Sequence, residues 1–216
     1  MLNIIGEKSS VFNRFMQEIR DIKIQKDPMR FRINLERLGE IFAYEISKQL
    51  EAETVSVETP LGIADISVPK PSIVLATILR AGLPLHQGML NMFDGAENAF
   101  ITAYRKYSKD NSFEIKIEYL SCPSLDGKVL VIADPMVATG ASMYLTYRAL
   151  LEKGTPLHTH IVAPIISKDG VDYIRKHFSQ KNISLWVGAI DDELTVKSYI
   201  VPGLGDAGDL AYGKKL

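Results

Sequence analysis

Apolar side chains recur at intervals of three and four residues in the first quarter of the chain. The clearest set is Phe31, Leu35, Leu38, Phe42 and Ile46. Residues with this spacing share one face of an α-helix, which turns once in about 3.6 residues. Asp27 is suited to the N-cap and Pro28 to the first helical position, so we predict a helix from Asp27 to about Leu50. A shorter amphipathic helix is expected before it, with an apolar face of Phe12, Phe15, Ile19 and Ile22.

Four later runs are apolar at consecutive positions and rich in β-branched residues. They are Ile73–Leu79, Val129–Ala133, Ile161–Ile166 and Leu185–Ile190. This composition is typical of strands that are buried on both faces, as in a parallel sheet. Segments of helical length alternate with them, namely Leu83–Phe93, Gly140–Lys153 and Asp169–Lys181. The alternation predicts βαβ units, and hence an α/β fold with an open sheet.

Two further segments alternate between apolar and polar side chains. Residues 55–68 predict a small hairpin with its turn at Thr59–Gly62. Phe113–Leu120 predicts a half-exposed antiparallel strand that pairs with Ala99–Tyr104. The polar segment Arg105–Ser112 between them is expected to be a mobile flap.

Length and charge narrow the class of protein. A chain of 216 residues without repeats or linkers is expected to form one domain over 1–216, with a helical part over about 1–52 and a distinct C-terminal segment over about 191–216. The 25 basic and 26 acidic side chains nearly cancel, which argues against binding to nucleic acid or an anionic membrane through overall charge. One cysteine excludes an internal disulfide and a cysteine-based zinc cluster. No secretory signal or membrane helix is recognisable, so a cytoplasmic location is expected.

The segment after the run Val129–Ala133 combines an acid with small and hydroxyl residues. It reads Asp134, Pro135, Met136, Val137, Ala138, Thr139, Gly140, Ala141, Ser142, and a helical segment follows. Ligands bind at the carboxyl ends of strands in an open α/β sheet, so Asp134 is expected at that rim. Backbone N–H groups and hydroxyls of Thr139–Ser142 can surround an anion. The combination suits a sugar phosphate, although taken alone it is equally compatible with a turn and a helix cap.

Three separated motifs resemble those of one enzyme family. Val129–Ser142 resembles the phosphoribosyl diphosphate signature of the type I phosphoribosyltransferases. Ile78-Leu-Arg-Ala-Gly82 and Tyr199-Ile-Val-Pro-Gly-Leu-Gly-Asp-Ala-Gly-Asp209 are similar to motifs of the uracil branch, and the last is the most specific. The motifs stand in family order, and the resemblance extends from about Phe31 to Gly213. It implies the fold of that family, an open, mostly parallel sheet flanked by helices, with N-terminal helices and a small β-hairpin or flap.

The resemblance also implies a reaction and a set of site residues. The reaction is transfer of a phosphoribosyl group from 5-phospho-α-D-ribose 1-diphosphate (PRPP) to N1 of uracil, giving UMP and diphosphate in pyrimidine salvage. The residues implied for PRPP are Asp134, Pro135, Met136, Val137, Ala138, Thr139, Gly140, Ala141 and Ser142, together with Arg80, Arg105 and Asp206. Those implied for uracil, largely through backbone groups, are Ile200, Gly205, Asp206 and Ala207. The residues implied for catalysis are Arg80, Arg105 and Asp206.

The cofactor and partners follow in part from the same resemblance. Many type I enzymes carry two adjacent acids before the loop, whereas Pro135 follows Asp134 here, so Mg²⁺ is expected to arrive bound to the diphosphate rather than to protein ligands. Some family members respond to GTP, which makes GTP a candidate effector. The amphipathic N-terminal helices and the exposed strand surface suit a homodimer or a higher homo-oligomer.

Other interpretations stay open at this stage. If the base is recognised mainly through backbone groups, the side chains reveal little about which base binds. A transferase of the same fold that acts on another base is therefore one alternative. A nucleotide-sensing regulator that binds RNA is another, and it needs a basic surface. Gly203–Gly208 matches the dinucleotide fingerprint, but the eight residues after it leave no room for the helix and strand of that motif. His158 and His160 lack a third ligand in sequence and are interpreted as structural.

Overall fold

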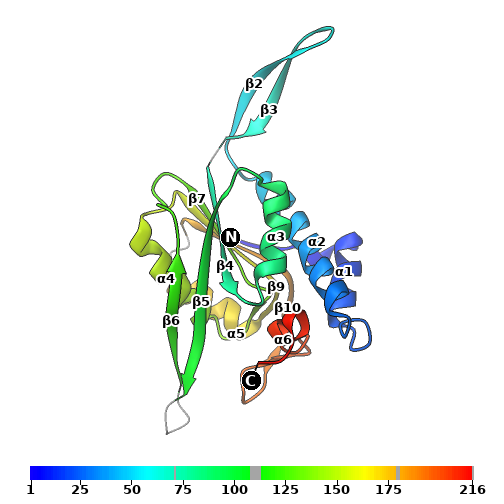
Figure 1. Ribbon diagram of the computed structural model, residues 1–216, viewed down its shortest axis with the longest axis vertical. Coiled ribbons are helices and arrows are strands. Elements are labelled where there is room, and N and C mark those ends of the chain that lie inside the picture. Colours follow the sequence, from blue (N-terminus) through cyan, green and yellow to red (C-terminus); the bar gives the residue numbers. More distant parts are fainter. Residues whose placement is uncertain (71, 108–112, 179–180, 216) are drawn as a thin grey trace.

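A mixed sheet runs through the middle of the molecule (Figure 1). The computed structural model describes residues 1–70, 72–107, 113–178 and 181–215, without the side chains of 103–107 and 113–116. Within these ranges the strands of the sheet are β1 (Leu2–Ile4), β4 (Ile73–Leu79), β5 (Glu97–Tyr107), β6 (Phe113–Ser121), β7 (Val129–Ala133), β8 (Met136–Val137), β9 (His158–Ser167) and β10 (Ile183–Asp191). Their spatial order is β1, β10, β9, β7, β4, β5, β6, and the short β8 lies beside β9.

Parallel pairing dominates this sheet. Neighbouring strands from β1 across to β5 run parallel, and β6 runs antiparallel to β5. The four apolar runs of the sequence are β4, β7, β9 and β10, and all of them occupy interior places. The predicted α/β fold with an open, mostly parallel sheet is therefore confirmed.

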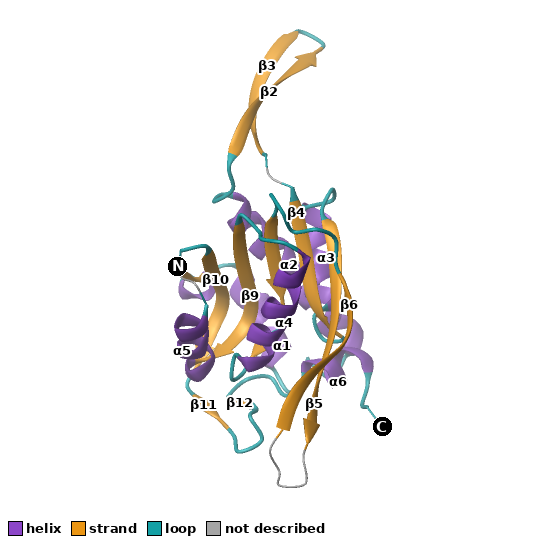
Figure 2. Cartoon of the chain, turned by 90° about the vertical axis from the view of Figure 1, so that its left-hand side faces the viewer, coloured by secondary structure: helices purple, strands orange, loops and turns teal. Residues whose placement is uncertain are grey.

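Helices cover both faces of the sheet (Figure 2). One face carries α1 (Val11–Arg20), α2 (Pro28–Ser47), α3 (Leu83–Met92) and α6 (Ala207–Tyr212), and the other carries α4 (Ala141–Leu150) and α5 (Lys168–His177). Two short 3₁₀ helices, η1 (Ile5–Glu7) and η2 (Leu151–Lys153), complete the helical elements. In the part of the chain that the structure describes, none of the helices is both long and apolar enough to cross a membrane.

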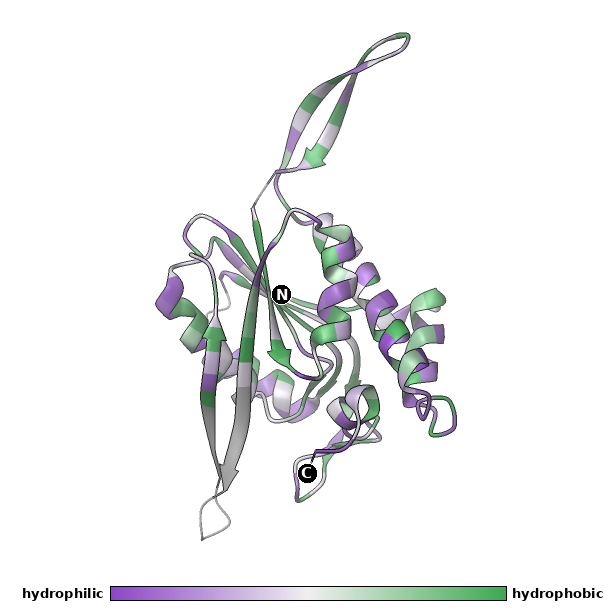
Figure 3. Ribbon diagram, viewed as in Figure 1, coloured by the Kyte–Doolittle hydropathy of each residue, from purple (hydrophilic) through white to green (hydrophobic). Residues whose placement is uncertain are grey.

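Alternate residues of each interior strand enter two separate cores. Successive side chains of a strand point to opposite faces. Ile73 and Leu75 of β4 therefore join the core under α2, while Val74 and Ala76 join the core under α4 and α5. The strands are accordingly among the most apolar parts of the chain (Figure 3). Each fully buried large aliphatic side chain contributes about 1.5–3 kcal/mol, so the two cores hold the strand register firmly.

Helix α2 begins where the sequence predicts. The Asp27 carboxylate accepts hydrogen bonds from the backbone N–H groups of Met29 (3.0 Å) and Arg30 (3.1 Å). Helix α1 ends at Arg20, so the prediction that Ile22 belongs to its apolar face was wrong, and the Ile22 side chain is exposed.

The first residues of the chain form a strand instead of a helix. Leu2–Ile4 pairs in parallel with Leu185–Val187 at the edge of the sheet. The expectation of a helical part over about 1–52 was therefore wrong for this stretch. An open sheet edge offers hydrogen bonds that come from residues far along the chain, and local periodicity does not report them.

Strands β5 and β6 form a long antiparallel ribbon, which confirms the predicted pairing. The ribbon is longer than predicted: residues 105–107 belong to β5, so Arg105 lies in a strand and the rest of the expected flap, 108–112, is outside the described residues. Thr102 pairs with Tyr119 and Ala103 pairs with Ile117, which leaves Glu118 as an extra residue, or bulge. Beyond the bulge the predicted alternation fails, because Leu120 packs on the core and Tyr119 is exposed.

Two small hairpins stand outside the sheet, at opposite ends of the molecule (Figure 2). The larger consists of β2 (Ala52–Thr59) and β3 (Gly62–Pro69), and it confirms the predicted turn at Thr59–Gly62. The smaller consists of β11 (Glu193–Leu194) and β12 (Ile200–Val201) and leads into α6.

Candidate functional site

The carboxyl ends of the parallel strands lie at the end of the molecule that carries β11, β12 and α6 (Figure 2). Asp134 follows β7, and Arg80 follows the neighbouring β4. Asp191 is the last residue of β10, two places further along the sheet from β7. A parallel sheet therefore collects residues from distant parts of the sequence at one rim.

The loop after β7 is tied first to strand β9. The backbone N–H of Asp134 donates to the carbonyl of Val162 (3.1 Å), and the N–H of Ile165 donates to the carbonyl of Pro135 (3.2 Å). Met136 and Val137 then pair in parallel with β9 as β8. The Asp134 carboxylate accepts a hydrogen bond from the N–H of Met136 (3.3 Å). The first half of the loop is therefore a fixed extension of the sheet.

The second half of the loop is held by the start of α5. The Ser167 hydroxyl donates to the carbonyl of Ala138 (2.5 Å) and accepts from the N–H of Gly170 (2.9 Å). A Cβ on Gly170 would lie 2.6 Å from the Ala138 carbonyl oxygen, so only glycine permits this approach. Gly140, which precedes α4, has φ +80°, a left-handed conformation that also favours glycine. The loop is thus fixed in shape before any ligand binds.

The loop surrounds a small hollow of about 80 Å³. Its walls are Asp134, Met136, Val137, Ala138, Thr139, Gly140, Ser142 and Met143. The predicted residues Pro135 and Ala141 are in the loop but do not line the hollow. The structure therefore brings the acid and the small hydroxyl residues of the sequence motif around one space, at the N-terminal end of α4.

Burial disfavours the charged form of the Asp134 side chain. It raises the pKa of the carboxyl from 3.8 to about 7, against the opposing effect of the Met136 N–H, which stabilises the carboxylate. A raised carboxyl pKa beside a hollow is typical of a functional site. It adds nothing to the stability of the fold near neutral pH, because the ionised form is disfavoured in the folded protein.

Arg80 connects the β4 end of the sheet to the C-terminal segment. Its Nη2 donates to the carbonyl of Gly213 (3.2 Å) and lies 3.5 Å from the carboxylate of Asp209. Its Nε is buried and has no hydrogen-bond partner among the described residues. A buried N–H without a partner is unfavourable unless a ligand satisfies it.

The last residues of β4 and the turn after it both approach the end of β7. The Thr77 hydroxyl donates to the carbonyl of Ala133 (3.2 Å), and a Cβ on Gly82 would lie 3.0 Å from the same carbonyl oxygen. On its other side, a Cβ on Gly208 would lie 3.8 Å from Nη2 of Arg80. The loop after β7 and the C-terminal segment therefore lie on the same side of the molecule, with the turn at residues 80–82 between them.

The predicted base-binding residues run from β12, which contains Ile200, through the loop with Gly205 and Asp206 to Ala207, the first residue of α6. Ile200 and Ala207 are buried, while Gly205 is exposed with φ +96°. The Asp206 carboxylate accepts the N–H of Asp209 (2.9 Å) and thereby caps α6. Arg105 lies in β5, and its side chain is outside the described part of the structure.

Sequence analysis missed several residues that hold the C-terminal segment in place. Arg20 and Asp191 bind Gly203, and Arg32 donates to the carbonyl of Ala211 (2.7 Å). Asp191 ends a buried strand, so the rule that placed Asp134 at the rim applies equally to it. The two arginines gave no local signal, because they lie more than 170 residues away from their partners.

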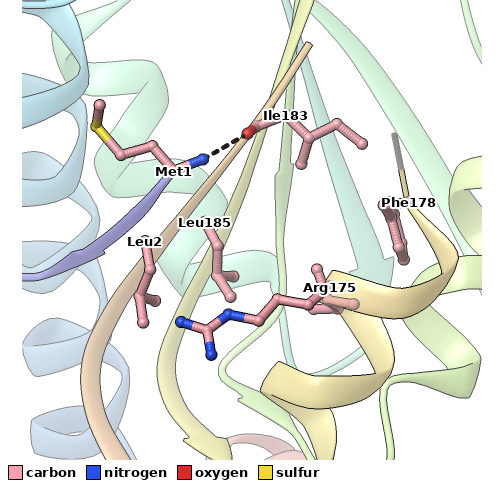
Figure 4. A pocket seen from close by; sticks show the side chains of 7 residues that line it. Met1, Leu2, Arg175, Phe178, Ile183 and Leu185 are labelled. Carbon is pink, nitrogen blue, oxygen red and sulfur yellow. Dashed lines mark hydrogen bonds between the residues drawn. The ribbon is translucent and has the colours of Figure 1, made fainter. Parts of the chain in front are cut away.

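A second pocket, of about 160 Å³, lies where β1 and β10 begin, at the opposite end of the sheet strands. Figure 4 shows the side chains that line it. Met1 and Leu2 line it together with Arg175, Phe178 and residues from the start of β10, and the terminal amino group of Met1 donates to the carbonyl of Ile183 (3.0 Å). This pocket lies at the amino ends of the strands, where α/β proteins do not place their active sites, and its lining is largely apolar.

The two histidines of β9 are engaged within the sheet. Nδ1 of His160 accepts a hydrogen bond from the indole N–H of Trp186 (2.9 Å), and burial lowers the pKa of His160 to about 3. Nε2 of His158 is hydrogen-bonded to Ser184 (2.9 Å). Among the described residues no three His, Cys, Asp or Glu side chains are grouped closely enough to hold a metal ion.

Comparison with known proteins finds uracil phosphoribosyltransferases among the relatives in sequence. The family model described as uracil phosphoribosyltransferase matches residues 7–214. A uracil phosphoribosyltransferase of Porphyromonas gingivalis is 56% identical over 212 residues, which cover 98% of each sequence. Among solved structures, the AQ2163 protein of Aquifex aeolicus aligns with a TM-score of 0.87 and 31% identity, covering 99% of this chain and 98% of that one. A hypoxanthine phosphoribosyltransferase of Staphylococcus aureus shares the fold, with a TM-score of 0.52 and 12% identity over 87% of this chain and 84% of that one.

Replacing Asp134 by Asn is expected to change how stability depends on pH. In the wild type, the partly buried carboxyl loses its proton less readily when folded, so stability falls as pH rises from the unfolded pKa of 3.8 to the folded pKa of about 7. The amide that replaces the carboxyl does not titrate. The free energy of unfolding of Asp134→Asn should therefore rise relative to wild type across this range and stay level above it, as measured by urea unfolding at several pH values.

The matched control is Asp172→Asn, which removes an exposed carboxyl from α5. Its difference from wild type should stay nearly constant over the same pH range. A constant difference for Asp134→Asn as well would show that burial does not disfavour the Asp134 carboxylate.

Proposed function

This chain belongs to the uracil phosphoribosyltransferase family, and we propose that it transfers the phosphoribosyl group of PRPP to N1 of uracil. The products are UMP and diphosphate. One observation carries the proposal: the Asp134–Ser142 loop, Arg80 and the segment from Ile200 to Asp209 lie at one rim of the sheet. An anion-binding loop, a cation and a base-binding backbone are the three parts that this reaction needs.

The hollow of the Asp134–Ser142 loop is the proposed site of the 5-phosphoribosyl group. Thr139 and Ser142, which carry hydroxyl groups, line it at the start of α4, and the positive end of the α4 dipole would add to the attraction for a phosphate. The Asp134 carboxylate would accept hydrogen bonds from the ribose hydroxyls. Those bonds favour the charged form, so substrate binding would lower the pKa of Asp134 from about 7.

Arg80 is the proposed partner of the diphosphate. Its buried Nε lacks a partner among the described residues, and Nη2 is already held by Gly213 and Asp209, so the guanidinium is oriented before substrate binds. A charged donor of this kind stabilises an oxyanion more strongly than a neutral one. Arg105 and Asp206 complete the proposed catalytic set on the strength of the family motif.

Mg²⁺ is proposed to enter as part of the PRPP substrate. The wall of the hollow contains a single carboxylate, Asp134, among the described residues, so most of the oxygen ligands of Mg²⁺ would come from the diphosphate and from water. Bound to diphosphate oxygens, the ion would neutralise part of the charge of the leaving group.

Uracil is proposed to bind against the backbone of residues 200–207. A Cβ on Gly205 would meet nothing within 4 Å, so the space beside this residue is open, while φ +96° is a conformation that favours glycine. A planar base can therefore approach the main chain closely here. Backbone N–H and C=O groups match the alternating donors and acceptors on the edge of uracil.

The chemistry of the transfer suits these residues. The bond from C1 of the ribose to the diphosphate oxygen breaks, the bond from C1 to N1 of uracil forms, and the N1–H proton passes to the departing diphosphate or to water. Positive charge develops on the sugar and negative charge on the leaving diphosphate, beside the guanidinium of Arg80. Stabilisation of that developing charge is the main task of the protein, and no nucleophilic side chain is required.

Purified protein with Mg²⁺, PRPP and uracil is expected to release UMP and diphosphate. Arg80→Gln should lower kcat by about 10²-fold, because the leaving diphosphate then loses the charged hydrogen-bond donor that stabilises its developing negative charge. Arg148→Gln, which removes an exposed arginine of α4, should leave kcat unchanged.

Two other results would contradict the proposed reaction. Turnover of hypoxanthine or orotate in place of uracil would overturn the assignment of uracil as the substrate. Salt-dependent binding of RNA without any turnover would favour a nucleotide-sensing regulator that binds RNA. GTP, which the family resemblance makes a candidate effector, is proposed to change kcat or KM in the same assay, and equal kinetics with and without GTP would exclude it.

We also propose that the chain forms a homodimer or higher homo-oligomer through the β2–β3 hairpin. Val55 pairs with Ile66, and Val57 pairs with Ala64, so these four side chains share one face of the hairpin. In the described part of the chain no other element packs extensively against it. A lone two-stranded hairpin with an apolar face is marginally stable in water, so a second copy is the proposed cover.

A charge on the apolar face of the hairpin is expected to weaken the assembly. Ile66→Lys places an ammonium group on that face, whereas Ser67→Lys places it on the opposite face one position along the same strand. Sedimentation velocity should show a smaller species for Ile66→Lys and the wild-type species for Ser67→Lys. Wild-type protein that is monomeric at all concentrations, or equal behaviour of the two variants, would exclude assembly through this face.

A further inference from the structure

The C-terminal segment has little regular structure to hold its own shape. Its strands β11 and β12 contain two residues each, and α6 contains six. Between them, residues 202–205 have no repeating hydrogen bonds of their own. A segment of this kind keeps one conformation only when other parts of the protein bind its backbone groups.

An ion pair from two other elements binds the middle of this segment. Asp191, the buried last residue of β10, receives two hydrogen bonds from Arg20 at the end of α1, each 2.8 Å long and each to a different carboxylate oxygen. One of these oxygens also accepts the N–H of Gly203 (2.8 Å), and Nη1 of Arg20 donates to the carbonyl of Gly203 (3.0 Å). Both backbone groups of Gly203 are therefore held by the same ion pair.

Gly203 is itself tightly confined. A Cβ at this position would lie 2.2 Å from the carbonyl oxygen of Ile200, and φ is +54°. Its position is thus defined on one side by Ile200 and on the other by Arg20 and Asp191. Since Ile200 and Gly205 flank it closely in sequence, a displacement of Gly203 must move the backbone on both sides of it.

We propose that the Arg20–Asp191 ion pair positions the uracil-binding backbone and thereby sets the affinity for uracil without touching either substrate. This inference rests on the proposed function, which assigns uracil to residues 200–207. Backbone recognition needs the main chain itself in the correct place, and a misplacement of about 1 Å can cost roughly 10²-fold in rate. Neither residue lines the hollow of the Asp134–Ser142 loop, so PRPP binding should depend on the pair much less.

The nature of the pair supports a positioning role. A buried ion pair is costly to desolvate and often contributes little more to stability than apolar residues of the same size. The guanidinium and the carboxylate, however, meet through two parallel hydrogen bonds, and this arrangement fixes the orientation of both side chains relative to each other. Two other arginines, Arg32 and Arg80, each donate to one carbonyl of the segment further on, at Ala211 and Gly213.

The test compares the same exchange at two ion pairs. Arg20→Lys keeps the positive charge but cannot form the two parallel hydrogen bonds of the guanidinium. Asp191→Asn keeps an oxygen that can accept the Gly203 N–H but loses the negative charge. Arg30→Lys is the control: Arg30 of α2 forms two hydrogen bonds with the buried carboxylate of Glu18 of α1, and the described hydrogen bonds of these two side chains go to residues of α1 and α2, not to the C-terminal segment. In the full chain, uracil and PRPP are varied separately in the steady-state assay, and hydrogen exchange of residues 200–207 is measured without ligand.

Both test variants are expected to raise KM for uracil by roughly 10-fold or more while KM for PRPP changes little. Hydrogen exchange over 200–207 should quicken in both and stay at the wild-type rate in Arg30→Lys. An unchanged KM for uracil, or an equal rise of both KM values, overturns the proposal, as does loss of folding in both variants when Arg30→Lys folds. Absence of uracil turnover in the wild type would instead overturn the proposed function, and the exchange measurement would still report whether the pair fixes the segment.

Discussion

The parallel register of β4, β7, β9 and β10 is the constraint on which the candidate site depends. Parallel strands end at the same edge, so residues from separate motifs meet there although they lie far apart in sequence. The two buried cores fix this register, because a slip of one residue would exchange the side chains that face each core. The loop after β7 continues the pairing through β8, and its shape is therefore determined by the sheet as well as by its own residues.

The two halves of the site are built on different physical principles. The Asp134–Ser142 loop is held by backbone pairing to β9 and by close packing against α5. The C-terminal segment has almost no such pairing and is held by charged side chains from α1, α2 and the end of β4. The N-terminal helices therefore do more than cover one face of the sheet, since Arg20 and Arg32 reach the segment proposed to bind uracil.

Most of the fold was predictable because it depends on local patterns. The four buried strands and the capped helix α2 follow from apolar runs and helical spacing, and the loop at Asp134 follows from its place after a strand. What could not be predicted depends on distant partners: the pairing of Leu2–Ile4 with β10, the bulge at Glu118, and the contact of Arg20 with Asp191. The motif pointed to segments that the structure brings to one rim of the sheet, whereas the residues that hold the C-terminal segment became visible only in the structure.

A crystal structure with UMP bound is the sharpest test that the two segments form one site. The 5′-phosphate should lie in the hollow, within hydrogen-bond distance (about 2.7–3.2 Å) of backbone N–H groups in Thr139–Ser142. The pyrimidine ring of the same molecule should lie against the main chain of residues 200–207. A phosphate bound elsewhere, or a uracil ring that points away from residues 200–207, would show that the rim of the sheet is not the site of the transfer.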